Sequence, residues 1–153
     1  MSLLRDILGQ VGRTMTAYAG DKALMLAAVS AAANVIVADG EVAGREFDAA
    51  LHGLRADPVL MKGYDALMLE TELYEGIARA RTRLGRAENL RHVGAVAEWP
   101  VGQRENVFLI AADVADHDGI STIEATALGE ISAALRVDGL GLLRANPVRR
   151  PPA

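Results

Sequence analysis

The sequence predicts an all-α protein, a compact bundle of helices. Of its 153 residues, 51 % are hydrophobic but only 4 % are aromatic, so Ala, Leu, Val and Ile must form the core, as helix packing favours. Apolar residues recur at spacings of three and four, the period of an amphipathic helix. No segment shows the alternation between paired turns that is typical of strands, so a single helical domain is expected.

The first two predicted helices lie at the start of the chain. Residues 3–18 form an amphipathic helix whose apolar stripe consists of Leu4, Leu8, Val11, Met15 and Tyr18. Gly20 ends this helix, and Asp21 can N-cap a second helix that continues to Ala38. Because the second helix is apolar on nearly every side, we expect it in the middle of the fold.

Three further helices are predicted in the middle of the chain. One covers about residues 45–55 and stops before Pro58, because proline disfavours helix in the residue that precedes it. After a short connection, residues 64–85 and 86–99 form two helices that break near Gly85. Glycine is the usual residue at such a break.

Two helices complete the predicted domain. Pro100 suits the first turn of a helix that runs to Ala115, and a last long helix covers Thr122–Leu135. A single turn is expected at residues 140–143. We therefore predict one domain, residues 1–143, followed by a flexible C-terminal tail, residues 144–153.

Composition also predicts where the protein is located. The N-terminus has Asp6 and no extended apolar segment before a cleavage site, which argues against a signal peptide. The most apolar stretch, residues 23–38, is shorter than the roughly 20 residues of a membrane span. Cysteine is absent, which excludes disulfides and thiolate chemistry. We therefore expect a cytoplasmic protein without a membrane span.

Two similar turns follow apolar helices in the two halves of the chain. Residues 37–51 read VADGEVAGREFDAAL, and residues 114–128 read VADHDGISTIEATAL. Each copy is an apolar helix, an acidic turn, a small apolar residue and a second helix. Asp39 and Asp116 occupy equivalent positions 77 residues apart, which predicts two halves related by pseudo-twofold symmetry.

Helix initiation explains part of this pattern. Ser121 and Glu124 fit a capping box, in which each side chain accepts from the other residue's backbone N–H. Glu46 can act as the equivalent acid in the first turn, although Ala43 replaces the serine. Gly40 and Gly119 suit tight turns, where a left-handed backbone is tolerated by glycine.

Capping does not explain the remaining acids, which follow the negative end of a helix dipole and repel one another: Asp39, Glu41, Asp116 and Asp118. Water can solvate them, or a divalent cation can bind their oxygen atoms. The second turn is not an EF-hand, because Gly119 is fourth rather than sixth and Ala127 stands where a bidentate Glu is required. Both alternatives, solvated turns and a cation site, therefore remain.

These twin turns, ADGEV followed by Glu46 and ADHDGIS followed by Glu124, resemble those of the tellurite-resistance TerB family. The similarity covers residues 1 to about 143. The resemblance implies a compact fold of about seven helices with pseudo-twofold halves. It also implies a role in tellurite and general stress resistance without enzymatic activity, beside other tellurite-resistance proteins that include a membrane-attached partner.

The resemblance assigns the metal-binding acids to one residue set: Asp39, Glu41, Glu46, Asp116, Asp118 and Glu124. Calcium is the expected ion, ahead of magnesium and zinc, because a D-x-D start followed by a later Glu is suggestive of calcium. Ala43 departs from the usual serine, and His117 is a further departure. A lone turn histidine is more often solvated than bound to zinc or nickel.

The chemistry of the chain limits this role. Reduction of tellurite needs electrons, and the sequence has no cysteine and no flavin, haem or nicotinamide motif. Catalytic motifs for serine hydrolases, P-loop enzymes and zinc proteases are also missing. A metal-dependent hydrolase would need a general base and an open coordination position, so we expect a protein that is not an enzyme.

A basic helix face supplies the alternative function. Arg79, Arg83 and Arg86 lie on one predicted face, which could bind an acidic partner or recruit the protein to the inner face of the membrane. A solvated face is the ordinary explanation. The net charge of −4 and the lack of interleaved aromatic residues argue against nucleic-acid binding. The leading hypothesis is thus a cation-binding or scaffold domain, and the alternative is a metal-free adaptor.

Overall fold

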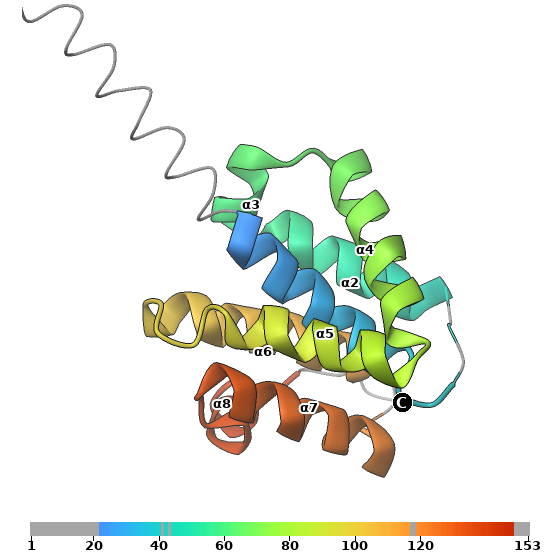
Figure 1. Ribbon diagram of the computed structural model, residues 1–153. Coiled ribbons are helices and arrows are strands. Elements are labelled where there is room, and N and C mark those ends of the chain that lie inside the picture. Colours follow the sequence, from blue (N-terminus) through green and yellow to red (C-terminus); the bar gives the residue numbers. More distant parts are fainter. Residues whose placement is uncertain (1–21, 41, 43, 117–118, 149–153) are drawn as a thin grey trace, which may run out of the picture.

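The computed structural model describes residues 22–40, 42, 44–116 and 119–148 of the chain. Within these residues the protein is all-helical, which confirms the predicted fold class. The helices form a compact bundle (Figure 1). The predicted helix over residues 3–18 lies outside the described residues.

One helix, residues 22–36, runs through the middle of the bundle and is called the central helix below. From Ala27 to Ile36, every side chain that is apolar is at most 1 % exposed, and Ser30 and Asn34 are buried with them. A helix that is apolar on nearly all sides can be stable only when neighbours cover all of it. The predicted central position is therefore confirmed.

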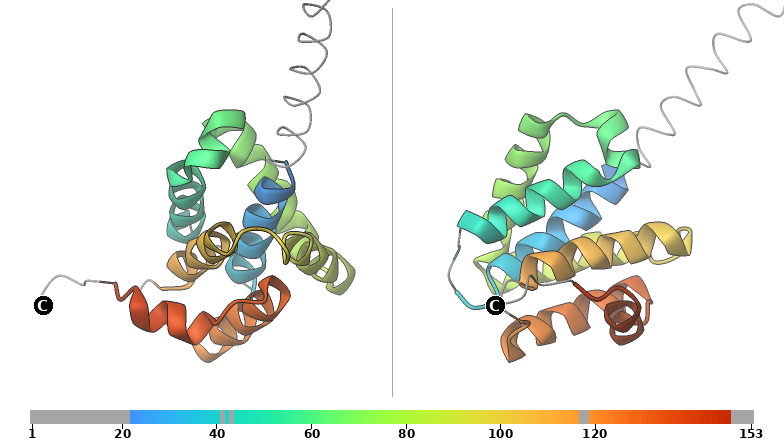
Figure 2. Two further views of the ribbon diagram at one scale, coloured as in Figure 1. Left: turned by 90° about the vertical axis from the view of Figure 1, so that its left-hand side faces the viewer. Right: turned by 180° about the vertical axis from the view of Figure 1, so that it is seen from behind.

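Five helices surround the central helix in a closed ring: α2 (Gly44–Ala56), α4 (Ala66–Ala80), α5 (Arg83–Gly94), α7 (Thr122–Leu135) and α6 (Val101–Ala115). Each contacts the next in this order, and α6 contacts α2 again. Figure 2 shows the central helix between α5 on one side and α6 on the other. Two short helices complete the fold, α3 (Pro58–Gly63) between α2 and α4 and α8 (Gly139–Ala145) against α6 and α7.

The predicted helix boundaries hold best where a cap defines them. α7 covers the predicted Thr122–Leu135, and its start carries the predicted capping box, with Ser121 N donating to Glu124 Oε1 at 3.1 Å and Glu124 N donating to Ser121 Oγ at 3.2 Å. Arg136 ends α7 in a left-handed conformation. The sequence-based expectation for α7 is therefore correct at both ends.

Other boundaries differ from the prediction, and α5 already ends at Gly94 rather than at residue 99. Residues 58–63 form α3 rather than a connection, because Asp57 Oδ1 accepts from Val59 N at 2.9 Å and Pro58 fits the first helical position. The break between α4 and α5 falls at residues 81–82, where Thr82 caps α5 by accepting from Gly85 N at 3.0 Å. Gly85 itself lies inside α5, so the break predicted near it is displaced by a few residues.

The absence of a side chain at Gly85 serves packing instead. A Cβ at this position would overlap the backbone oxygen of Arg79. α4 and α5 can meet this closely only because residue 85 is glycine. The turn glycines behave as predicted, since Gly40 and Gly119 have φ values of +84° and +101°.

Candidate functional site: the paired acidic turns

Acids of the two predicted turns come together in the fold. Glu46, in the first turn of α2, is close enough to Asp39 of its own turn and to Glu124 of the second turn for both to repel its charge. The predicted acids Glu41 and Asp118, together with His117, lie outside the described residues. We call the described group of Asp39, Glu46 and Glu124 the acidic cluster.

Glu46 is the perturbed member of the acidic cluster. Burial raises its pKa from 4.5 to about 7, with repulsion from Asp39 and then Glu124 adding to the shift and Arg45 opposing it. Within the described residues, its Oε2 atom is inaccessible to solvent and accepts no hydrogen bond. Glu46 is therefore a carboxyl group whose ionised form is poorly stabilised by the surrounding protein.

Glu124 has a partner of its own. Its Oε1 accepts from the backbone N–H of Ser121, which opens α7. The capping box fixes this carboxylate beside Glu46 and leaves its second oxygen for another interaction. Capping and participation in the acidic cluster are thus compatible for one side chain.

Asp116, the remaining described acid of the predicted set, faces a different neighbour. It lies next to Asp113, whose pKa is raised by burial and then by Asp116, while His52 on α2 lowers it. Sequence reasoning missed Asp113, although its spacing of three residues from Asp116 at the end of α6 is a detectable signal. The second turn therefore places Glu124 close to Glu46 and Asp116 close to Asp113.

These acids do not form a complete metal site by themselves. Among residues 22–40, 42, 44–116 and 119–148, no group of three or more His, Cys, Asp or Glu side chains could hold a metal ion. The acidic cluster is close enough for electrostatic repulsion but does not form a coordination sphere within this part of the chain. Glu41 and Asp118 are the remaining predicted ligands.

The predicted basic face is divided by the fold. Arg79 Nε donates to Asn89 Oδ1 at 2.8 Å, and Arg86 Nη2 pairs with Glu130 Oε1 at 2.7 Å, so both side chains make contacts within the domain. Arg83 is exposed. The structure therefore does not bring the three arginines together as one free surface.

Arg79 and Arg86 belong instead to a buried polar network around the central helix. Asn89 Nδ2 donates to Asn34 Oδ1 at 2.9 Å and to the Gly76 oxygen at 3.1 Å, and Asn34 Nδ2 donates to the Arg86 oxygen at 3.3 Å. Asn34 and Asn89 are at most 1 % exposed. Their hydrogen bonds offset the cost of burying these amide groups.

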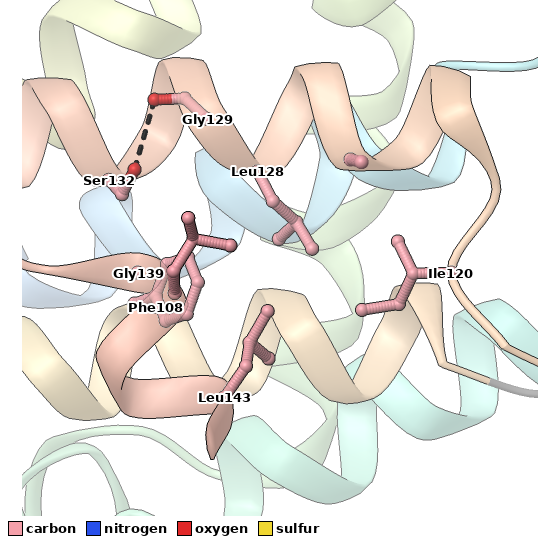
Figure 3. A pocket seen from close by; sticks show the side chains of 9 residues that line it. Phe108, Ile120, Leu128, Gly129, Ser132, Gly139 and Leu143 are labelled. Atoms are coloured by element: carbon pink, nitrogen blue, oxygen red, sulfur yellow. Dashed lines mark hydrogen bonds between the residues drawn. The ribbon is translucent and has the colours of Figure 1, made fainter. Parts of the chain in front are cut away.

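A separate hollow of about 220 Å³ lies between α6, α7 and α8 (Figure 3). Phe108, Leu128 and Leu143 point into it, and Ile120 reaches it from the end of the second acidic turn. Ser132 Oγ donates to the Gly129 oxygen at 3.0 Å at one edge. Its lining residues carry no carboxylate, so this hollow is distinct from the acidic cluster.

The fold and site define an all-helical protein with a carboxylate cluster between two turns. No protein-family model, no curated protein and no solved structure matches the chain in the comparisons. The resemblance to the TerB family thus stays a prediction from the twin motifs. Within the described residues, no helix is both long and apolar enough to cross a membrane.

Proposed function

We propose that the paired acidic turns form one shared binding site for a divalent cation, with calcium as the preferred ion, in a protein that is not an enzyme. The observation that carries this proposal is the position of Glu46. Its carboxyl group is half-buried between acids of both turns, and one oxygen lacks a hydrogen bond within the described residues. A hard cation relieves such repulsion and prefers carboxylate oxygens.

The raised pKa gives the proposed site a characteristic proton linkage. Because the pKa of Glu46 is about 7, this carboxyl group is about half protonated at neutral pH. A cation binds the deprotonated form, so binding should release about half a proton at pH 7 and tighten as the pH rises to 8. An exposed carboxylate with an ordinary pKa would release no proton on binding the cation, because it is already ionised at pH 7.

Calorimetric titration of the metal-stripped protein with calcium, magnesium and zinc tests the proposal. We expect calcium binding that raises the melting temperature by mass action and that releases protons in buffers of different ionisation enthalpy. Glu46→Gln should remove both effects. Asp48→Asn is the matched control, because Asp48 is an exposed acid on the same helix. The absence of heat and of any melting shift with all three ions would contradict the proposal.

We further propose, from the resemblance alone, that the domain acts in tellurite or stress resistance as a cytoplasmic scaffold beside a membrane-attached partner. The acidic cluster supports this role as a surface that a cation or a basic partner segment could bridge. Cells that lack the protein should become sensitive to tellurite and regain resistance with the wild-type chain but not with Glu46→Gln. Full rescue by Glu46→Gln would separate the resistance function from the cluster.

The alternative, a metal-free adaptor with a basic face, now depends on a changed set of arginines that keeps Arg83 but not Arg79 or Arg86. Arg81, Arg83 and Arg91 are exposed around the α4–α5 connection and along α5. If this surface recruits the protein to anionic membranes, Arg81→Glu with Arg83→Glu should abolish binding to phosphatidylserine vesicles. Arg144→Glu, an exposed position on α8, is the control. Unchanged vesicle binding would reject the adaptor surface.

A further inference from the structure

An apolar surface lies where α3 connects to α4, at the top of the molecule in Figure 1. Met61, Leu67 and Met68 are exposed there, and we call these three residues the α3–α4 patch. Leu67 and Met68 also line a hollow of about 280 Å³ together with Tyr64, Thr71 and Glu72. Single exposed apolar residues are common, but adjacent ones at the rim of a hollow indicate a surface that another segment covers.

The described part of the chain begins at the same end of the molecule. The central helix and α4 run in the same direction, and a Cβ at Gly76 would lie 3.0 Å from Val29 Cγ1. Lys22 is seven residues before Val29, and Leu69 is seven residues before Gly76. Because both helices rise by about 1.5 Å per residue, Lys22 and the start of α4 lie at a similar level.

The 21 residues that precede Lys22 have the composition that such a surface requires. Residues 3–18 are predicted to form an amphipathic helix, and the apolar stripe of such a helix needs an apolar surface to pack against. Residues 3–18 carry two arginines and one aspartate, Arg5, Arg13 and Asp6, whereas Glu72 and Glu75 follow Met68 on one face of α4. The charges of the segment and of this face of α4 are therefore complementary.

Chain length favours a segment from the same molecule. Only residues 19–21 separate the predicted helix from the central helix, and connections of two to five residues commonly join two antiparallel helices. If residues 3–18 form the predicted helix, the short connection keeps its C-terminal end, with Met15 and Tyr18, within a few residues' reach of Lys22. This end is the part of the segment within reach of the α3–α4 patch.

We propose that the amphipathic N-terminal segment, residues 3–18, docks on the α3–α4 patch of its own chain. The patch lies beside the first residues of the central helix, whereas the first acidic turn follows its last residues. The docking surface and the proposed cation site therefore consist of different described residues. The inference does not depend on the proposed function, and the two can fail separately.

A matched pair of leucine substitutions tests the docking. Leu67 is 71 % exposed and Leu84 is 77 % exposed in the described domain, and each is the second residue of its helix. If the N-terminal segment covers Leu67, then Leu67→Ser should lower the melting temperature of the full chain by about 4 °C. Leu84→Ser should leave it unchanged. Equal effects of the two substitutions would overturn the proposal.

A coupling measurement identifies the occupant. Met15→Ser should lower the melting temperature as Leu67→Ser does, and the double variant should melt no lower than the more affected single variant. The melting temperature should not depend on protein concentration, because the contact lies within one chain. Additive effects would show that the two side chains do not meet. A concentration-dependent melting temperature lost in Leu67→Ser would assign the patch to a second copy and overturn docking within one chain.

Discussion

At the scale of single residues, the ionisation of Glu46 should make stability depend on pH. Its pKa is raised from 4.5 to about 7 in the folded protein, so between these values the folded state binds more protons than the unfolded state. Stability is therefore greatest below the unfolded pKa and is lost as the pH rises towards 7. Because Glu46 keeps some solvent contact, we expect a loss of about 1 to 2 kcal/mol.

Urea denaturation of the metal-free protein from pH 5 to pH 8 measures this loss. Glu46→Gln should flatten the pH profile and should be more stable than the wild type at pH 8, since it removes the repelled charge. Asp48→Asn, on the same helix, should keep the wild-type profile. A wild-type protein whose stability rises through this pH range would contradict the assignment.

The sequence predicted part of the acidic cluster because the motif is duplicated. Matching the two turns pairs Glu46 with Glu124, and both residues carry a recognisable helix-start signal. Sequence could not show that His52 of α2 lies close to Asp113, since this requires α2 to pack against α6. It also could not show that Arg79 and Arg86 turn into the fold, because a helical face is defined only when its neighbours are placed.

At the scale of helices, Gly85 should tolerate no side chain. A Cβ would overlap the Arg79 backbone oxygen, and a backbone atom cannot move aside as a flexible side chain could. We expect Gly85→Ala to cost about 3 kcal/mol of unfolding free energy by forcing α4 and α5 apart. Chemical denaturation would measure this cost.

Gly129 provides the opposite case on α7. It is exposed and helical, and a Cβ there would meet nothing within 4 Å. Gly129→Ala should therefore stabilise the protein by about 0.5 to 1 kcal/mol through helix propensity. Equal effects of the two glycine substitutions would show that the close contact of α4 and α5 is unimportant.

These two glycines also show why some helix boundaries were predicted correctly and others were not. A glycine in a sequence indicates either a break or a close approach, and only the neighbouring helix decides between them. α7 was predicted correctly because Ser121 and Glu124 define its start locally. α3 could have been found in the same way, since Asp57 before Pro58 is a helix-start signal. We interpreted Pro58 only as the end of the preceding helix, because proline disfavours helix in the residue before it.

At the scale of the whole molecule, the closed ring of helices explains why the central helix is so apolar. Its alanines allow five neighbours to approach, and its burial follows from the sequence pattern alone. Asn34 does not follow from that pattern. In the sequence it only interrupts an apolar run, whereas in the fold it joins the central helix to α5. The pseudo-twofold relation of the two halves stays a prediction.

Asn89 is the residue through which this polar network joins three helices. Its side chain donates to Asn34 on the central helix and to the Gly76 oxygen on α4, and it accepts from Arg79. Truncation would leave these partners unsatisfied in a region that water does not reach, because Asn89 is fully buried. Loss of this one side chain should therefore weaken the contacts among the central helix, α4 and α5.

We expect Asn89→Ala to cost about 3 kcal/mol and to lower the melting temperature by about 10 °C. Asn106→Ala is the control, because Asn106 is an exposed asparagine on α6 and its truncation should change stability by at most about 0.5 kcal/mol. Hydrogen exchange should show faster exchange in the central helix, α4 and α5 together for Asn89→Ala. If only α5 exchanged faster, the network would be a local cap rather than a connection between helices, because a shared network must loosen all the helices that it joins.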